Sequence, residues 1–304
     1  MSTMHTHLDT HELTRQVQAL YAQVALHPQA GYHFPVGRQL AERLGYPAGL
    51  LDQIPGEALS SFAGVGFHLE LAQVTPGQRV LDLGCGSGTD SFAAVQLVGP
   101  TGWVVGVDMS AEQLAKADRL RAGAPNVRFV PGRLEALPFP DRSFDAVISN
   151  GVFNLCPDKA QVFREAARVL RPGGRLSAAD IVASRALPDS VTCNADLWTV
   201  CIGGAAPADD YLRWLAAAGL TAGELHDVPQ YHFLSPQAAN ATDTYGVRAV
   251  TYAAHRAQRR TTTSRSAASR LRLEDLRSGR SMGRARRRPP SRSHMRGGAA
   301  PPCC

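Results

Sequence analysis

Two aspartates and three glycines have the types and the spacing of a nucleoside-binding turn. Asp82 precedes Gly84, Gly86 and Gly88, and Asp108 follows them further along the chain. Glycines, which lack a Cβ, let the backbone turn sharply and come close to a ligand. A carboxylate about 20 residues beyond such a turn can accept hydrogen bonds from the hydroxyls of a ribose. The pattern therefore predicts a site that holds a nucleoside.

A βαβ unit must position these residues. Residues 79–83 form a short apolar run that is typical of a parallel strand covered on both faces, and this run leads into the glycine turn. Residues 91–97 predict a helix, and residues 102–108 predict a second strand. We therefore expect the glycine turn after the first strand and a carboxylate at the end of the second.

The glycine spacing also separates two kinds of nucleoside site. A dinucleotide fingerprint would have a glycine where Thr89 stands and an apolar residue where Asp82 stands. The pattern instead resembles the first motif of class I S-adenosylmethionine (SAM) methyltransferases. That resemblance implies SAM as the cofactor, with the three glycines along it and Asp82 towards its methionine end. It also implies that Asp108 binds the ribose and that Met109 lies against the adenine.

Two later segments extend the same resemblance. A strand is predicted to end at Asn150, which should face the methyl donor because open parallel sheets bind ligands at the carboxyl ends of their strands. Residues 132–139 resemble the segment from which an acid contacts the adenine amino group in this family. Arg133 stands at that acid's position, so adenine recognition is assigned to the backbone at Leu134 or to Glu135.

The periodicity along the chain predicts a Rossmann-like α/β fold, with a doubly wound sheet of mostly parallel strands. Further strands are expected at residues 127–130 and 175–182, and an antiparallel C-terminal pair at 220–228 and 245–253. The predicted domains are a helical N-terminal cap over 1–60, a methyltransferase domain over 61–255 and a disordered Arg/Ser/Pro-rich tail over 256–304. Within the cap, helices are expected in residues 1–30 and over 38–44 and 50–54.

Three segments narrow the resemblance further. Residues 154–159, 179–182 and 198–205 read NLCPDK, ADIV and WTVCIGGA. Together they look like the arsenite methyltransferase group, which implies methyl transfer from SAM to trivalent arsenic held by thiolates. Trivalent arsenic is soft and prefers sulfur ligands, and it keeps a lone pair that can attack the sulfonium methyl.

The cysteines depart from that group. Cys201 falls on one of the arsenic-binding cysteines that the resemblance implies, but Val65 and Gly151 stand where the others are expected. Cys156 follows in the same loop as Gly151 and is the candidate substitute, and Cys193 is a second one. Glutathione or another small thiol can also complete the coordination of arsenic. We therefore assign Cys201 and Cys156 to the acceptor side.

Other functions remain open at this stage. The segment 135–139 and the Pro-Gly-Gly turn at 172–174 are shared with methyltransferases that act on carbon or oxygen of quinones, sterols or other small metabolites. Such an enzyme needs a base near the methyl group, for which His33, His68 or Asp180 would serve. Outside enzymes, the alternatives are a protein that binds SAM without turning it over and a nucleic-acid binder that uses its basic tail.

Charge is unevenly distributed. The net charge is +6, but residues 255–304 hold 14 of the 32 basic residues and two of the 26 acidic ones. The remaining chain is mildly acidic, so contact with nucleic acid is expected at most from the tail, and without sequence specificity. His5, His7 and His11 have no cysteine or acid cluster beside them, so no metal site is predicted.

Cysteine usage and the N-terminus bear on the compartment. Six cysteines among 304 residues form no disulfide framework, which makes a reducing cytoplasm the expected location. The first residues lack the basic and then apolar pattern of a signal peptide. No apolar run approaches the roughly 20 residues that span a membrane, so no membrane contact is expected.

Overall fold

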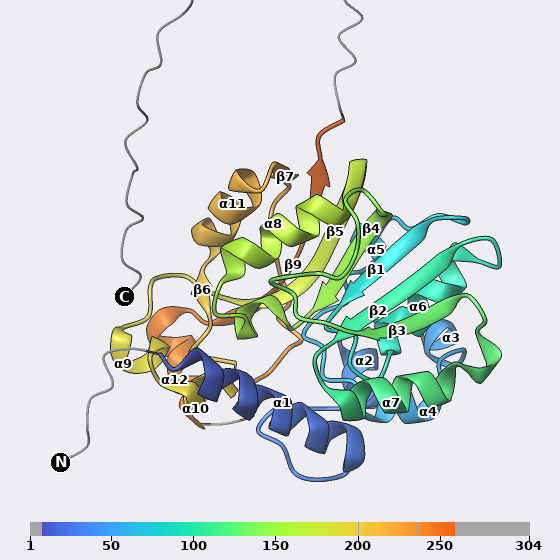
Figure 1. Ribbon diagram of the computed structural model, residues 1–304. Helices are drawn as coiled ribbons and strands as arrows, with labels where there is room; N and C mark the ends of the chain where they lie inside the picture. Colours follow the sequence, from blue (N-terminus) through green and yellow to red (C-terminus); the bar gives the residue numbers. More distant parts are fainter. Residues whose placement is uncertain (1–7, 200, 235, 259–304) are drawn as a thin grey trace, which may run out of the picture. The chain divides into compact units, whose positions relative to one another are not determined.

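In the computed structural model, which describes residues 8–199, 201–234 and 236–258, a mixed sheet organises the chain (Figure 1). Its strands are β1 (Arg79–Leu83), β2 (Trp103–Asp108), β3 (Val127–Pro131), β4 (Phe144–Asn150), β5 (Leu170–Ala183), β6 (Ala206–Pro207), β7 (Leu220–Ala222), β8 (His226–Asp227) and β9 (Arg248–Arg256). The spatial order is β3-β2-β1-β4-β5-β9-β7, with β6 beside β5 and β8 beside β9.

Strand direction confirms the predicted fold class. Strands β1 to β6 pair in parallel, and β9 runs antiparallel between β5 and β7. The chain leaves β1 towards β2 and β3 and later returns on the other side of β1 as β4. Open α/β sheets bind ligands outside the carboxyl ends of their strands at such a switch point. The ends of β1, β2 and β4 therefore mark the expected site.

The helices are α1 (Thr10–Leu26), α2 (Arg38–Arg43), α3 (Ala48–Leu51), α4 (Gly56–Ser60), α5 (Leu69–Ala72), α6 (Thr89–Val98), α7 (Ala111–Leu120), α8 (Lys159–Val169), α9 (Asp189–Thr192), α10 (Ala195–Thr199), α11 (Ala208–Ala217) and α12 (Pro236–Tyr245), with short 3₁₀ turns η1 (Arg121–Gly123) and η2 (Phe153–Leu155). Figure 1 shows α8 and α11 on one side of the sheet and α6 on the other.

Alternation along the strands divides the core between these two sides. On β4, Val147 packs with residues of α8 and α11, whereas Ile148 packs with residues of α2, α4 and α6. Successive side chains of a strand point to opposite faces, so a strand covered on both faces is apolar at every position. The side chains of β4 therefore contribute to the hydrophobic core on each side of the sheet. The polar residues of the site can then lie at the carboxyl end of the strands.

The N-terminal helix α1 crosses that carboxyl end (Figure 1). Leu13 and Val17 on its buried face pack with Trp198 of α10, beside Met109 and Leu155. The Asp9 carboxylate caps the helix by accepting from the backbone N–H groups of its first turn. The helix predicted within residues 1–30 is thus present, and it covers the site rather than standing apart from it.

Some predicted boundaries were wrong. The helix expected over 50–54 is α3, which begins at Ala48 and ends at Leu51. It begins earlier than expected because the fixed φ of Pro47 suits the residue before a helix. The long strand expected over 220–228 is two short ones, β7 and β8. Helix α12 was not predicted, and β9 begins after the left-handed Gly246, which has φ +64°.

Other expectations lie outside the described residues. These include most of the tail over 256–304 and two of the histidines considered for a metal, His5 and His7. The domain boundaries at 60 and 255 stay predictions. Among the described residues, none of the helices combines the length and the apolar character that crossing a membrane requires.

Candidate cofactor and acceptor site

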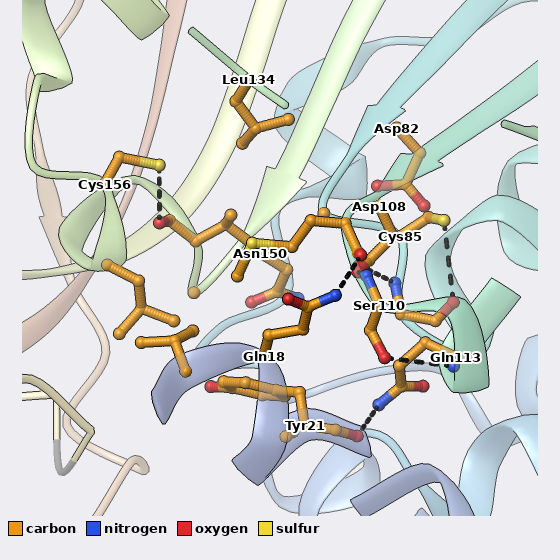
Figure 2. A pocket seen from close by; sticks show the side chains of 18 of the residues that line it. Gln18, Tyr21, Asp82, Cys85, Asp108, Ser110, Gln113, Leu134, Asn150 and Cys156 are labelled. Atoms are coloured by element: carbon orange, nitrogen blue, oxygen red, sulfur yellow. Dashed lines mark hydrogen bonds between the residues drawn. The ribbon is translucent and has the colours of Figure 1, made fainter. Parts of the chain in front are cut away.

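A cleft lies at the carboxyl ends of β1, β2 and β4, beneath α1 (Figure 2). The predicted site residues that line it are Asp82, Gly84, Gly86, Asp108, Met109, Leu134, Asn150 and Cys156. Figure 2 shows Cys156 at one end of the cleft and Asp82 and Asp108 at the other. Two predicted residues, Gly88 and Cys201, do not belong to the lining. The structure thus brings eight of ten predicted positions into one cavity.

The glycine turn has the geometry that its sequence predicts. Gly84, Gly86 and Gly88 have φ of +68°, +51° and +93°, in the region that favours glycine. A Cβ at Gly84 would lie 2.5 Å from a methyl of Val152, so a side chain there would push the β4 loop away. A Cβ at Gly88 would lie 2.9 Å from Phe92 instead, which makes this glycine a packing residue of α6 rather than part of the cleft wall.

Asp108 ties the turn to the end of β2. Its Oδ2 accepts from the Gly86 N–H at 2.9 Å, and its Oδ1 accepts from the Ser110 N–H, also at 2.9 Å. Burial raises its pKa, and these backbone donors oppose the rise. An ionised carboxylate has about four lone-pair sites. The carboxylate therefore keeps acceptor capacity for ligand hydroxyls while its position is set by protein contacts.

A second carboxylate, Asp90, lines the cleft beside Asp82 and was not predicted. Asp82 accepts from the Ser91 hydroxyl at 2.6 Å, and Asp90 accepts from the Tyr46 hydroxyl at 2.6 Å. Burial, and then the charge of Asp90, raise the pKa of Asp82 well above its ordinary value. Burial alone would raise the pKa of Asp90 too, but the hydrogen bond and charge of His68, with further donors, bring it below the ordinary value. Asp90 is therefore the ionised member of the pair.

Asn150 holds the segment before β1 against the end of β4. Its Oδ1 accepts from the Val65 N–H at 2.8 Å, and its Nδ2 donates to the Gly66 carbonyl and to Asp90 at 3.0 Å. A Cβ at Gly64 would lie 2.6 Å from this amide nitrogen. The backbone at Gly64 therefore comes close to the end of β4, where no side chain would fit. The side-chain amide of Asn150 is already hydrogen-bonded to protein groups. We therefore expect Asn150 to contact a ligand mainly by van der Waals packing.

Helix α1 is bound to the cofactor side of the cleft by amide side chains (Figure 2). Gln18 donates to the Met109 carbonyl at 2.9 Å, and Gln113 of α7 donates to the Tyr21 carbonyl at 2.8 Å. Gln113 also accepts from the Ser87 hydroxyl at 2.5 Å, which reaches the glycine turn. The sequence analysis missed these residues, because a polar side chain in a helix does not reveal which distant carbonyl it meets.

At the opposite wall, Leu134 is buried and lines the cleft as predicted. Arg133 and Glu135 line it as well and form an ion pair at 3.6 Å. The arginine that replaces the acid of the related segment is therefore adjacent to an acid two residues later.

The two assigned cysteines lie in different surroundings. Cys156 lines the cleft with its sulfur 3.5 Å from the Val152 carbonyl oxygen, and burial raises the pKa of its thiol strongly. Cys201 is buried outside the lining, and burial raises its pKa to about 12. Its carbonyl accepts from the Asn154 side chain at 3.4 Å. Cys193 is half-buried beyond α9.

The two positions where the resemblance implies further cysteines are neighbours. A Cβ built on Gly151 would lie 3.4 Å from a methyl of Val65. Val65 is buried, and Gly151 has φ +72°. The fold thus brings both positions together, with Gly151 in the cleft lining and Val65 buried behind it, but supplies an apolar side chain at one and none at the other.

The candidate bases of the rival function do not reach the cleft lining. His33 contacts the Thr199 carbonyl oxygen at 2.7 Å, and the buried His68 contacts Asp90 at 3.3 Å. Asp180 is fully buried and accepts from the Asn154 N–H at 3.1 Å; burial raises its pKa to about 7. These contacts indicate structural positions for all three groups.

Comparison with known proteins agrees with the fold and the cleft. Residues 74–219 match a family model described as a methyltransferase domain. The arsenite methyltransferase of Halobacterium salinarum is 43% identical over 189 residues, which cover 61% of this chain and 48% of that protein. The crystal structure of CrArsM, an arsenic(III) S-adenosylmethionine methyltransferase from Chlamydomonas reinhardtii, is 31% identical with a TM-score of 0.53, over 74% of this chain and 75% of that one.

The chain therefore belongs to the class I SAM-dependent methyltransferases, the family whose cofactor is SAM. Within it, the chain is most similar to the arsenite methyltransferase group. It spans about half the length of the curated arsenite methyltransferases from Halobacterium salinarum and Aquipseudomonas alcaligenes that it matches. A demethylmenaquinone methyltransferase from Listeria welshimeri is also 42% identical, over 37% of this chain and 48% of its own length.

The cleft residues fit SAM. The methionine end of SAM carries an ammonium and a sulfonium, and this end of the cleft presents the buried carboxylates of Asp82 and Asp90. Asp108 keeps the acceptor capacity that ribose hydroxyls would need, and the left-handed glycine turn leaves room where Cβ atoms would stand.

Proposed function

We propose that this protein transfers a methyl group from SAM to trivalent arsenic bound by thiolates. The observation that supports this most is that one cleft contains both the cofactor carboxylates and the sulfur of Cys156. Similarity to arsenite methyltransferases supports the same acceptor. SAM, when bound, supplies an electrophilic methyl group on a sulfonium.

The residues of this chain would act by binding and orientation. Asp108 and the glycine turn hold the nucleoside, while α1 and the segment over 61–68 cover the cleft and exclude water. Cys156 keeps its proton at neutral pH because burial raises its pKa. On binding, its sulfur replaces a hydroxide on arsenic, and the thiol proton leaves with that hydroxide as water. The soft lone pair of the bound arsenic then faces the methyl group.

External thiols complete the arsenic site in this proposal. Val65 and Gly151 offer no sulfur, and Cys201 lies outside the cleft lining. Cys156 alone would bind arsenic weakly. Glutathione or another small thiol, entering with arsenic, would occupy the remaining ligand positions and would make the reaction depend on its concentration.

The test is transfer of a labelled methyl group from SAM to arsenite with excess glutathione. We expect Cys156→Ser to lose at least tenfold in kcat/KM, because the thiolate ligand in the cleft is removed. Cys193→Ser is the matched control and should keep wild-type activity, since Cys193 lies outside the cleft lining. Cys201→Ser decides whether the second assigned thiol takes part. SAM binding without any arsenic methylation in the wild type would contradict the proposal.

A second candidate is methyl transfer to carbon or oxygen of a small metabolite. The similarity to the Listeria welshimeri demethylmenaquinone methyltransferase favours a quinone within this class. The same assay with a demethylated quinone separates the two, because Cys156→Ser should not impair transfer to carbon. The cytoplasmic location and the SAM-binding or nucleic-acid-binding alternatives stay untested predictions.

A further inference from the structure

Two segments that mark the arsenite methyltransferase resemblance, residues 154–159 and 198–205, meet in the structure. The Asn154 side chain donates to the Cys201 carbonyl at 3.4 Å. A Cβ on Gly204 would collide with the carbonyl oxygen of Asn154, and a Cβ on Gly203 would collide with the ring of Trp198. At Gly204 the two segments pack backbone against backbone, whereas Gly203 leaves room for the Trp198 ring of its own segment. The contact thus joins the η2 turn to the segment that carries Cys201.

Lys159, five residues after Asn154, contacts Trp198 from an unusual setting. It is the first residue of α8 and is 5% exposed, and its Nζ donates to the Cys156 carbonyl at 3.0 Å. The start of a helix disfavours a cation, and burial of a charge is costly without partners. Its Nζ also lies 4.6 Å from the centroid of the Trp198 ring, within the roughly 6 Å of a cation–π contact. The Trp198 ring therefore offsets part of the free-energy cost of placing the buried Lys159 ammonium at a helix N-terminus.

Cys201, three residues after Trp198, has a strained backbone conformation. Cys201 has φ +62°, a conformation that a residue with a side chain rarely adopts. Its N–H donates to the Trp198 carbonyl at 2.9 Å, so its backbone follows the position of the tryptophan. Strained residues persist only where the surrounding structure determines them. The position of Trp198 is therefore a condition for the position of Cys201.

We propose that the Lys159–Trp198 pair keeps the Cys201 segment, residues 201–205, seated on the η2 turn, so that Lys159 is a positioning residue for Cys201. This proposal does not rest on the proposed function, in which Cys201 lies outside the cleft lining. The pair itself is independent of the acceptor and can be tested without arsenic.

The test measures how fast iodoacetamide alkylates Cys201, resolved from the other cysteines by peptide mass spectrometry. A buried thiol reacts only when its segment opens, so the rate reports the open population. We expect Lys159→Met and Trp198→Leu each to raise the Cys201 rate about thirtyfold, the change expected for loss of a desolvated cation–π pair. Lys159→Arg keeps a cation over the ring and should stay within about twofold of wild type. Cys85, in the glycine turn, is the internal control and should be unchanged.

Two outcomes would overturn the proposal. One is an unchanged Cys201 rate in both Lys159→Met and Trp198→Leu. The other is a rise in Lys159→Arg equal to that in Lys159→Met, which would assign the effect to packing rather than charge. SAM affinity, measured on each variant, identifies any variant that has lost its fold. If wild-type protein methylates no arsenite but these rates behave as expected, the proposed function fails and the positioning role stands.

Discussion

At the cofactor end of the cleft, two backbone N–H groups donate to the carboxylate of Asp108, each at 2.9 Å. At the acceptor end, the thiol of Cys156 has one hydrogen-bonding contact among the described residues, to a carbonyl oxygen at 3.5 Å. The first arrangement fixes a functional group before any ligand arrives. The second leaves the sulfur without a cation or a second thiol at hydrogen-bonding distance in the part of the chain that the structure describes. The protein therefore preorganises the functional group at the cofactor end but not the thiol at the acceptor end.

The two ends also differ in how far they match the resemblance. The cofactor end contains the three glycines, Asp82 and Asp108 of the motif, together with Asp90, which the motif did not predict. The acceptor end retains the fold that brings Val65 and Gly151 together, without the side chains that would make that meeting a thiol site. Binding of SAM and choice of acceptor are thus separable in this protein, and mutations at the two ends should affect different constants.

The largest effect is expected at the cofactor end, from Asp108→Ala. This change removes the ribose acceptor and also frees the Gly86 N–H, which loosens the turn. Hydrogen bonds to a charged group contribute about 1.5–3 kcal/mol each, so the Kd for SAM should rise about 100-fold. Isothermal titration calorimetry measures it. Asp108→Asn, which keeps one acceptor oxygen, should lose less. Equal affinities for wild type and Asp108→Ala would place the ribose elsewhere.

A smaller effect is expected at the acceptor end, from Val65→Cys combined with Gly151→Cys. This double variant should need less glutathione for methylation. The two sulfurs would lie near each other, since a Cβ at 151 is 3.4 Å from Val65. A protein thiol pair replaces external ligands, so the glutathione concentration for half-maximal methylation should fall about tenfold. The cost is a side chain at φ +72°, about 1 kcal/mol of stability, measured by urea unfolding. Val65→Cys alone is the control, and an unchanged glutathione requirement in the double variant would argue against an arsenic site here.

Sequence reasoning succeeded where local pattern and function coincide. The glycine turn and the carboxylate of Asp108 lie within one βαβ unit, so their spacing alone predicts their meeting. Asp90 was missed because its role depends on Tyr46, which is distant in sequence, and helix position alone gives no sign of it. The contact of Lys159 with Trp198 likewise joins segments whose proximity depends on how α8 and α10 pack. Long-range polar contacts carry no periodic signal.

The smallest effect is expected from Tyr46→Phe, which changes one donor at the cofactor end and keeps the ring packed on Phe62 and Phe67. The Tyr46 hydroxyl is among the donors that lower the pKa of Asp90. An acid with a lowered pKa contributes its charge above that pKa and loses it as the pH falls through it. Removing the donor raises the pKa of Asp90, so the fall in SAM affinity on acidification should begin at higher pH in the variant.

At neutral pH Asp90 stays ionised in both proteins, and the Kd for SAM should differ by about threefold or less. Titration of the Kd from neutral pH down to below about pH 3.9, the ordinary aspartate value, checks both statements. Tyr32→Phe, at a tyrosine that bonds only the His27 carbonyl among the described contacts, is the matched control and should follow the wild-type profile. Coincident profiles for Tyr46→Phe and wild type would show that Asp90 does not act on the bound cation. Asp108 would then be the carboxylate at the cofactor end that acts on SAM. The difference between the cofactor end and the acceptor end would depend on that one residue.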